Sequence, residues 1–272
     1  MSNLVKIGKD DLGKRMKENY ENIPKTRLMR RTPVAIRIDG KAFHTFTKGF
    51  KRPFDDVLAN SMHNTLLYLC KNIQGCVFGY TQSDEITLIL CDYQTFTTDA
   101  WFDYEVQKMC SISASMATMI FNKEFSKAVD NVILHADLHS DAENNKYINT
   151  LIKARDKGAM FDSRCFNILK EEVTNLIYWR QLDARRNSIQ MVGRANFSHK
   201  ELQCKSCNEI QDMLYERKGI NWDDTPVKYK RGVACYKYQD QSINSWALDF
   251  GMPIIKGEDR DYVEKHIHFE EE

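Results

Sequence analysis

The stretch Gly79-Tyr-Thr-Gln-Ser-Asp84-Glu85-Ile-Thr-Leu-Ile-Leu-Cys-Asp92 places two adjacent carboxylates at the point where a turn becomes a strand. The residues that follow Glu85 are apolar and partly β-branched, which is typical of a central β-strand. Residues 75–80, before the turn, read as another short strand. The pattern therefore predicts a hairpin over residues 75–91 with acidic side chains at its tip.

A second acidic strand end lies earlier in the chain. Residues 33–38, Pro-Val-Ala-Ile-Arg-Ile, predict a short strand that ends in Asp39-Gly40, where the glycine allows the backbone to approach a ligand closely. Clustered carboxylates at the edge of a buried sheet need a partner, and Mg²⁺ is commonly held by one or two carboxylates together with substrate phosphates. The alternative is that Asp39 and Asp84 are ordinary turn residues. Two such strand ends in one chain favour the metal hypothesis.

The order of the predicted elements indicates an α+β fold. Up to residue 168 they are a strand at 33–38, a helix at 56–71 that Asp55 can cap, the hairpin at 75–91, a helix at 104–124 and a strand at 164–168. This is the βαββαβ order of a ferredoxin-like sheet. Such a sheet puts the end of its first strand beside its central hairpin, so Asp39 and Asp84 are expected to be neighbours.

The remaining segments are predicted to be mainly helical. They are a short basic helix near 9–20, a loop with a helical piece over 129–158, a helix over 169–190, a helical segment over 198–218 and a hairpin rich in basic and aromatic residues within 226–269. This pattern predicts a helical and β-hairpin C-terminal part after the sheet.

Composition bounds the class of protein. A chain of 272 residues forms one large domain or two small ones, and we expect a division into 1–168 and 169–272. The net charge is +1, so binding to a polyanion would depend on local patches. No targeting or membrane-spanning segment is expected. Most of the eight cysteines lie in apolar runs, which favours a reducing, cytoplasmic setting.

Five motifs occur in an order that points to a known family. They are Arg37-Ile-Asp39-Gly40-Lys41-Ala-Phe43-His44-Thr-Phe46, Arg52-Pro53-Phe-Asp55, Tyr80-Thr-Gln82-Ser83-Asp84-Glu85, Phe161-Asp162-Ser-Arg164 and Trp179-Arg180-Gln181-Leu-Asp183. Together they resemble the tRNA(His) guanylyltransferase family, the 3′–5′ RNA polymerases. The resemblance implies a palm-like catalytic domain in residues 1–168 and an enzyme that adds nucleotides to the 5′ end of tRNA. Residues 169–272 would contact tRNA and neighbouring subunits.

The resemblance also implies roles for the residues at the two acidic strand ends. Asp39 and Asp84 would hold two Mg²⁺ ions with the Gly40 carbonyl, and Glu85 would support this catalytic cluster. The implied nucleotide pocket consists of Asp39, Gly40, Lys41, Ala42, Phe43, His44, Ser83 and Asp84. ATP would activate the RNA 5′ end, and GTP or another nucleoside triphosphate would supply the added nucleotide. Family members are commonly homotetramers, arranged as dimers of dimers, and the same is expected here.

One segment departs from the family pattern. The eukaryotic branch has His-Ile-Asn-Asn-Leu-Tyr-Asn-Thr after the Trp-Arg-Gln-x-Asp motif, whereas this chain has Arg185-Arg186-Asn187-Ser188-Ile189-Gln190-Met191-Val192. This segment resembles the guanylyltransferase-like branch instead. The resemblance favours template-directed repair of 5′-truncated tRNA over untemplated guanylate addition to tRNA(His). Two alternatives of other classes are a nucleotidyl cyclase and a tRNA-binding module without catalytic activity.

Several basic residues are candidate contacts for a triphosphate or for tRNA. They are Arg52, Arg164, Arg180, Arg185, Lys228, Lys230 and Arg231. Solvated charges and ion pairs with nearby acids are the alternative. Cys204-Lys-Ser-Cys207 with His199 hints at zinc, although one CxxC without a second pair is a weak signal. The alternating His and Asp residues over 135–141 are more typical of a solvent-facing loop than of a metal site.

Overall fold

The computed structural model describes residues 9–136, 142–240 and 243–269 of the chain. It contains a six-stranded antiparallel sheet in the order β4-β1-β3-β2-β5-β6. The strands are β1 (Val34–Gly40), β2 (Cys76–Gln82), β3 (Glu85–Leu90), β4 (Phe161–Asn167), β5 (Val233–Asp240) and β6 (Ile243–Asp249). The order and connectivity of the first four strands confirm the ferredoxin-like, palm-type α+β fold. β5 pairs with β2, so the C-terminal hairpin extends this same sheet.

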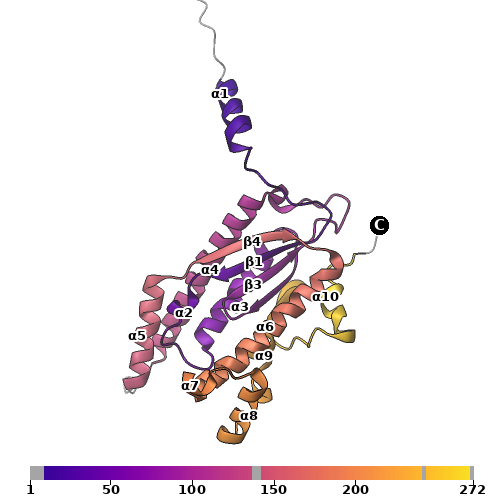
Figure 1. Ribbon diagram of the computed structural model, residues 1–272. Coiled ribbons are helices and arrows are strands. Elements are labelled where there is room, and N and C mark those ends of the chain that lie inside the picture. The colour runs from indigo at the N-terminus through magenta and orange to yellow at the C-terminus, as the bar shows by residue number, and fades with distance from the viewer. Residues whose placement is uncertain (1–8, 137–141, 241–242, 270–272) are drawn as a thin grey trace, which may run out of the picture.

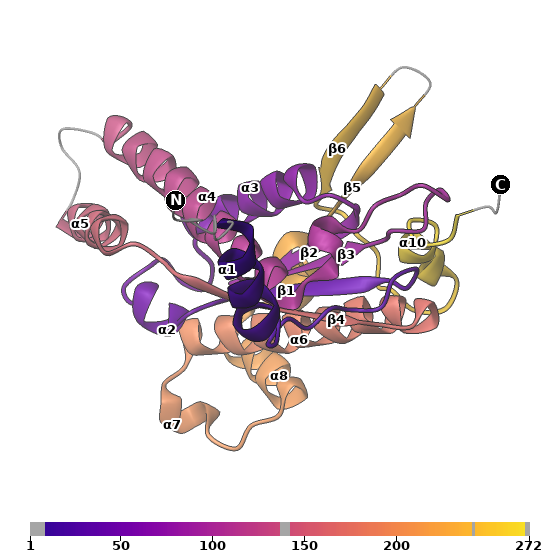
Figure 2. The ribbon, with the colours of Figure 1, turned by 90° about the horizontal axis from the view of Figure 1, so that it is seen from above.

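Helices cover both faces of the sheet, as Figure 2 shows. α3 (Asp56–Asn72) and α4 (Val106–Leu134) lie on one face, and α6 (Lys170–Asn196) lies on the other. β2 and α3 approach each other so closely that a Cβ on Gly79 would lie 2.4 Å from Cys70 Sγ. The glycine is therefore needed for the helix to pack directly on the strand.

The side chains of β1 alternate between two hydrophobic cores. Ile36 and Ile38 belong to the core beneath α3 and α4, whereas Ala35 belongs to the core beneath α6. Because successive side chains of a strand point to opposite faces, Arg37 and Asp39 lie on the α6 face with Ala35. The polar end of β1 is thus directed toward α6.

Shorter elements complete the chain. They are α1 (Lys9–Met16), α2 (Phe43–Phe46), α5 (Ala142–Lys157), α7 (His199–Leu202), α8 (Cys207–Lys218), α9 (Val227–Arg231) and α10 (Asp261–Glu264), with 3₁₀ segments at Trp101–Tyr104, Trp222–Asp224 and Gly257–Arg260 and a π-helical segment at Lys17–Glu21. α1 stands away from the body of the molecule in Figure 1. Among the helices of the described residues, none combines the length and the apolar character that crossing a membrane requires.

Asp55 fixes the segment that leads into α3. Its Oδ1 accepts a hydrogen bond from the Leu58 N–H at 3.1 Å, which is the predicted N-terminal cap. Its Oδ2 accepts hydrogen bonds from the Lys51 N–H at 3.0 Å and from the Tyr147 hydroxyl of α5 at 2.8 Å. One buried carboxylate thus holds the basic loop over residues 48–55 against two helices.

The prediction of a loop with a helical piece over residues 129–158 is wrong. α4 continues to Leu134, and α5 covers most of the remainder. The local composition is polar, but Val129 and Leu151 are fully buried in the α3–α4 core. Tertiary packing of these few apolar side chains therefore decides the conformation. Of the alternating His and Asp residues over 135–141, His135 caps the C-terminus of α4, and residues 137–141 lie outside the described residues.

The predicted helical segment over 198–218 is divided in two. The Ser198 and Ser206 hydroxyls each accept a hydrogen bond from the backbone N–H three residues later. The carboxylates of Glu201 and Glu209 in turn accept one from the backbone N–H of these serines, so each serine begins a separate capping box. α7 and α8 result, with a turn between them. α6 also runs to Asn196, beyond the predicted end at 190.

Candidate active site

The ends of β1 and β3 bring the two predicted carboxylates together. Asp39 is the register partner of Glu85, the first residue of β3. The Gly40 N–H also donates a hydrogen bond to the Asp84 carbonyl oxygen at 3.1 Å. Asp84 and Asp39 therefore sit at the same end of adjacent strands, as the ferredoxin-like topology requires.

The Asp84 carboxyl lies in an environment that disfavours its negative charge. Burial raises the pKa of Asp84 above its ordinary value of 3.8, and the nearby charge of Asp39 adds to the rise. The Ser83 hydroxyl opposes the rise by donating a hydrogen bond to Asp84 Oδ1 at 2.9 Å. A cation between Asp39 and Asp84 would relieve both their repulsion and the penalty of burial.

The raised pKa of Asp84 predicts a pH-dependent stability in metal-free protein. From about pH 4 upward, the unfolded chain has lost the Asp84 proton while the folded chain still retains it, so stability falls as the pH rises toward the folded pKa. Asp84→Asn removes this contribution. We measure the melting temperature in the presence of a chelator, from about pH 4 up to the folded pKa of Asp84. Over this range the melting temperature of Asp84→Asn is expected to fall less steeply with pH than that of the wild type. Parallel curves for the two proteins would contradict the burial argument.

Glu85 lies in a buried ion-pair cluster. Its Oε1 lies 2.6 Å from Arg180 Nε, its Oε2 lies 2.9 Å from Arg37 Nη2, and Arg180 Nη2 contacts Asp183 Oδ2 at 2.7 Å. Burial raises the pKa of Glu85, although both arginines oppose the rise. Because both carboxylate oxygens are engaged, Glu85 fixes the start of β3. Arg180, a predicted phosphate contact, is only 4% exposed and uses its charge inside the fold instead.

A cavity of about 560 Å³ opens beside Asp84, and we refer to it as the site cavity. Members of the predicted nucleotide pocket that line it are Gly40, Ala42, Phe43, His44, Ser83 and Asp84. The predicted phosphate contact Arg52 lines it as well. Asp39 and Lys41 are not among the described residues that line it. Its volume falls within the range of small-ligand sites, about 300–1,000 Å³.

Two turns at the site cavity hold residues with side chains in the left-handed backbone region. Ala42 has φ of 54° and Ser83 has φ of 51°. Such conformations cost on the order of 1 kcal/mol and occur preferentially at functional sites. A Cβ on Gly40 would lie 2.3 Å from Phe43 Cδ2, so the space that this glycine provides is filled by the Phe43 ring, and not by a ligand as the sequence suggested.

The two carboxylates fit a Mg²⁺ site that a substrate completes. Within the described residues, no group of three His, Cys, Asp or Glu side chains is placed to hold a metal ion. Two carboxylates match the number that Mg²⁺ usually takes at nucleotide sites, where phosphates and waters supply the other ligands. By the same observation, His199, Cys204 and Cys207 do not form a zinc-binding group.

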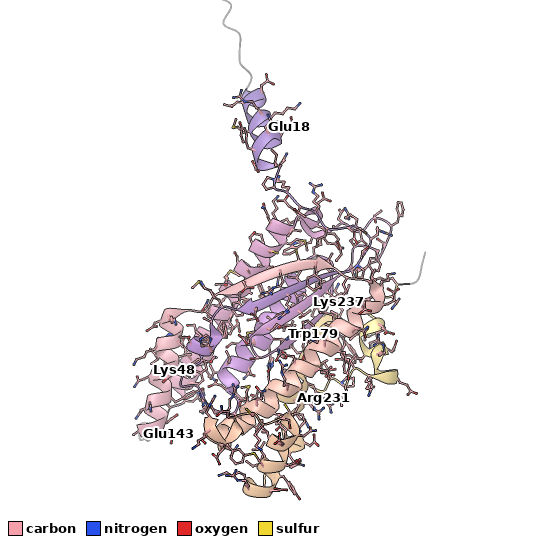
Figure 3. The ribbon with its side chains drawn as sticks, in the orientation of Figure 1. Glu18, Lys48, Glu143, Trp179, Arg231 and Lys237 are labelled. Carbon is pink, nitrogen blue, oxygen red and sulfur yellow. The ribbon has the colours of Figure 1, made fainter. Side chains whose placement is uncertain are left out.

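Three of the predicted basic contacts meet at a different place. Arg185, Lys230 and Arg231 line a cavity of about 320 Å³ beside Trp222. Arg185 and Lys230 lie over the Trp222 ring, 5.7 Å and 5.4 Å from its centroid. Figure 3 shows Arg231 well apart from Lys48, which lines the site cavity. These cations therefore lie apart from the nucleotide pocket. Lys230 is only 9% exposed and its Nζ lies 3.9 Å from Asp223 Oδ1, so its charge is partly compensated inside the fold.

The last two predicted basic contacts form ion pairs. Arg164 Nη2 lies 3.0 Å from Asp162 Oδ1, and Lys228 Nζ lies 2.8 Å from Asp56 Oδ1. Their charges are thus partly compensated by neighbouring carboxylates, which is the alternative that the sequence left open.

Sequence reasoning missed much of the wall of the site cavity. Its other lining residues are Thr47, Lys48, Phe50, Lys51, Pro53, Asp55, Leu58, Met191 and Arg194. The basic, glycine-containing loop over 48–55 marks most of them in the sequence. Met191 and Arg194 come from the end of α6, and no local pattern marks them because their place depends on how α6 crosses the sheet.

A palm-type sheet with carboxylates at the ends of adjacent strands, one of which lines a nucleotide-sized cavity, is typical of a nucleotidyltransferase of the palm class. The family model described as "Thg1: tRNAHis guanylyltransferase" matches residues 13–169, more than half of the chain. The chain belongs to the tRNA(His) guanylyltransferase family.

Similar proteins support this assignment. A bacterial tRNA(His) guanylyltransferase-like protein solved in complex with ATP is 40% identical, with a TM-score of 0.80 over 95% of this chain and 100% of that one. A structure described in the same words, in complex with GTP, is 38% identical, with a TM-score of 0.75 over 96% and 100%. The probable tRNA(His) guanylyltransferase of Dictyostelium discoideum is 24% identical over 230 residues, 80% of each chain.

Proposed function

We propose that this protein repairs 5′-truncated tRNA by adding nucleotides in the 3′–5′ direction, directed by the opposing strand. The observation that carries the proposal is the site cavity, where the strand-end carboxylate Asp84 and the cation Arg52 line one space large enough for a nucleotide. Arg52 has no ion-pair partner among the described residues. The ATP and GTP complexes of similar proteins support the use of both nucleotides. The departure from the eukaryotic signature over residues 185–192 supports the templated reaction.

In this proposal, the residues of the chain bind and orient two phosphorylated reactants. Asp39, Asp84 and the Gly40 carbonyl hold two Mg²⁺ ions, which when bound neutralise charge on the reacting phosphates. Arg52 binds phosphate oxygens from the loop that Asp55 holds in place. The site thereby brings the reacting groups together in an orientation that favours in-line displacement.

The reaction has two steps. The 5′-monophosphate of the RNA attacks the α-phosphorus of ATP, and pyrophosphate leaves. The 3′-hydroxyl of the incoming nucleoside triphosphate then attacks the RNA 5′ phosphorus, and AMP leaves. The RNA gains one nucleotide, whose triphosphate becomes the new 5′ end.

A tRNA transcript that lacks its 5′-terminal nucleotide tests the template requirement. With ATP, Mg²⁺ and one nucleoside triphosphate at a time, we expect the complementary nucleotide to be added at least about tenfold faster than the others. The reason is that a mispaired base leaves hydrogen-bonding groups unsatisfied. A transcript with a changed opposing base is the control, and the preferred nucleotide should change with it. Equal guanylate addition to both transcripts would contradict templated repair.

We further propose that residues 1–168 are the catalytic part, which supplies the carboxylates, and that residues 169–272 contact tRNA and neighbouring subunits. Met191 and Arg194 of α6 complete the wall of the site cavity. The cavity beside Trp222 supports RNA contact by the second part, because Arg185 and Arg231 line it and provide local positive charge. We propose a homotetramer as the assembly, and Leu12 and Met16, exposed on α1, offer apolar surface for contact with a neighbouring subunit.

A further inference from the structure

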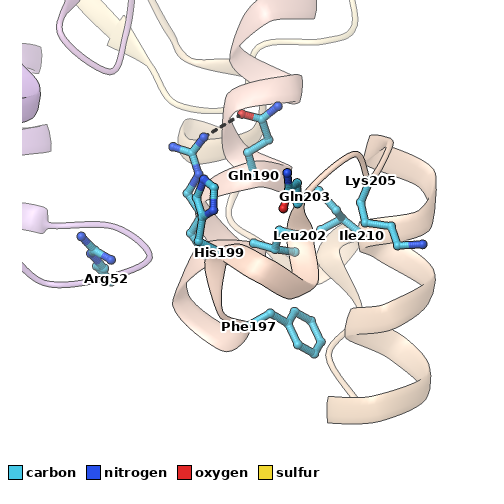
Figure 4. Close-up of a pocket in the computed structure, with 9 residues that line it drawn as sticks. Arg52, Gln190, Phe197, His199, Leu202, Gln203, Lys205 and Ile210 are labelled. Atoms are coloured by element: carbon cyan, nitrogen blue, oxygen red, sulfur yellow. Dashed lines mark hydrogen bonds between the residues drawn. The ribbon is translucent and has the colours of Figure 1, made fainter.

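A second cavity, of about 300 Å³, adjoins the site cavity. The end of α6, α7, the start of α8 and the loop that carries Arg52 form it, and we call it the α6–α8 cavity (Figure 4). Arg52 and Arg194 line both this cavity and the site cavity. The two guanidinium groups therefore stand at the boundary between the two spaces.

The charges of these two arginines are not neutralised by any carboxylate in the described part of the chain. No carboxylate of the described residues lies within ion-pair distance of Arg52 or Arg194. Arg194 makes only a long hydrogen bond among those residues, from Nη2 to Gln190 Oε1 at 3.5 Å, which Figure 4 shows as a dashed line. Arg180, about four turns earlier on the same helix, is by contrast paired with Glu85. Two unpaired guanidinium groups favour an anion, and their forked donors match phosphate oxygens.

The rest of the α6–α8 cavity suits a nucleoside. Phe197 and Ile210 belong to the small core between α6 and α8, and Leu202 packs against that core. All three present apolar surface to the cavity, and the Gln203 side chain adds an amide. A bare phosphate would gain nothing from an apolar wall, whereas a ribose and base would gain from both the apolar wall and the amide.

We propose that the α6–α8 cavity binds the 5′-terminal nucleotide of the RNA acceptor, with its 5′ phosphate between Arg52 and Arg194 and its nucleoside against Leu202. This inference rests on the proposed function, in which an RNA 5′ phosphate must meet a nucleoside triphosphate. Adjoining cavities that share two arginines satisfy this requirement, because the phosphates of both reactants then lie at the common boundary. A free nucleotide has the same chemistry, so the test must distinguish the two sources.

Fluorescence anisotropy with short acceptor-stem RNAs tests the proposal. The full-length protein is expected to bind a 5′-phosphorylated RNA about tenfold more tightly than the same RNA with a 5′-hydroxyl, because charge-assisted hydrogen bonds to the phosphate are lost. Arg194→Gln should abolish this preference. Leu202→Trp, which fills the cavity, should reduce it too. Lys200→Gln, at an exposed residue of α7 outside both cavities, should retain it.

Each result decides the question. An unchanged preference in Arg194→Gln, or no preference in the wild type, would overturn the inference. If guanosine 5′-monophosphate displaces the phosphorylated RNA at concentrations near the Kd of that RNA, the cavity binds a free nucleotide. This result would overturn the RNA assignment. Nucleotide addition is a separate measurement. A protein that shows the binding preference but adds no nucleotide would contradict the proposed function and leave the assignment of the cavity standing.

Discussion

Replacement of Asp84 by asparagine is expected to lower the rate of nucleotide addition at least about a thousandfold. Asn keeps the shape of the side chain but removes the charge that binds Mg²⁺, and metal stabilisation of phosphoryl transfer contributes several kcal/mol, at about 1.4 kcal/mol per factor of ten. The variant should stay folded, because burial already disfavours the charge of Asp84. Single-turnover addition to a truncated tRNA measures the rate, and thermal unfolding verifies the fold.

Asp130→Asn is the matched control for this loss. Asp130 is an exposed carboxylate on α4 that pairs with Arg155 at 2.9 Å and does not line the site cavity. Its replacement should leave the addition rate within about twofold, since exposed ion pairs contribute little. Activity near the wild-type level in a folded Asp84→Asn protein would refute the role of this carboxylate in catalysis.

Replacement of Arg180 by leucine is expected to destabilise the fold by about 3 kcal/mol, the typical cost of leaving one partner of a buried ion pair uncompensated. The side chains of Arg180 and Glu85 are 5% and 6% exposed and lie 2.6 Å apart. Arg37 still contacts Glu85 in the variant, which limits the loss. Urea unfolding measures the change in the free energy of unfolding.

Arg27→Leu provides the comparison for this second variant. Arg27 and Asp103 also lie 2.6 Å apart, but their side chains are 60% and 52% exposed. Water solvates both charges, so a clearly smaller loss of stability is expected. Equal losses for Arg27→Leu and Arg180→Leu would show that burial does not set the energetic role of Arg180.

Local sequence patterns were sufficient to predict the strands and the meeting of Asp39 with Asp84. Alternating or continuous apolar runs mark the strands, and the βαββαβ order then fixes which strand ends are adjacent. The Asp55 cap was also predictable, because capping depends on residues only three positions apart. Each of these features is encoded by near neighbours or by element order.

Features that depend on the packing of distant segments were not predictable in this way. The sequence shows Arg180 close to Asp183, but its partner Glu85 is remote in the chain, and only the docking of α6 on the sheet brings them together. The extension of α4 and the formation of α5 depend on the burial of a few apolar side chains in a polar segment. Arg194 reaches the site cavity for a similar reason, since the direction of α6 is set by its tertiary contacts.

The threefold anchoring of Asp55 has a consequence for ligand affinity. Its contacts with Leu58, Lys51 and Tyr147 restrict the loop that carries Arg52 before any phosphate arrives. The loop therefore loses its conformational entropy when the protein folds, and little more is lost when a phosphate binds. Preorganisation of this kind makes phosphate recognition and the integrity of the α3–α5 junction depend on a single carboxylate.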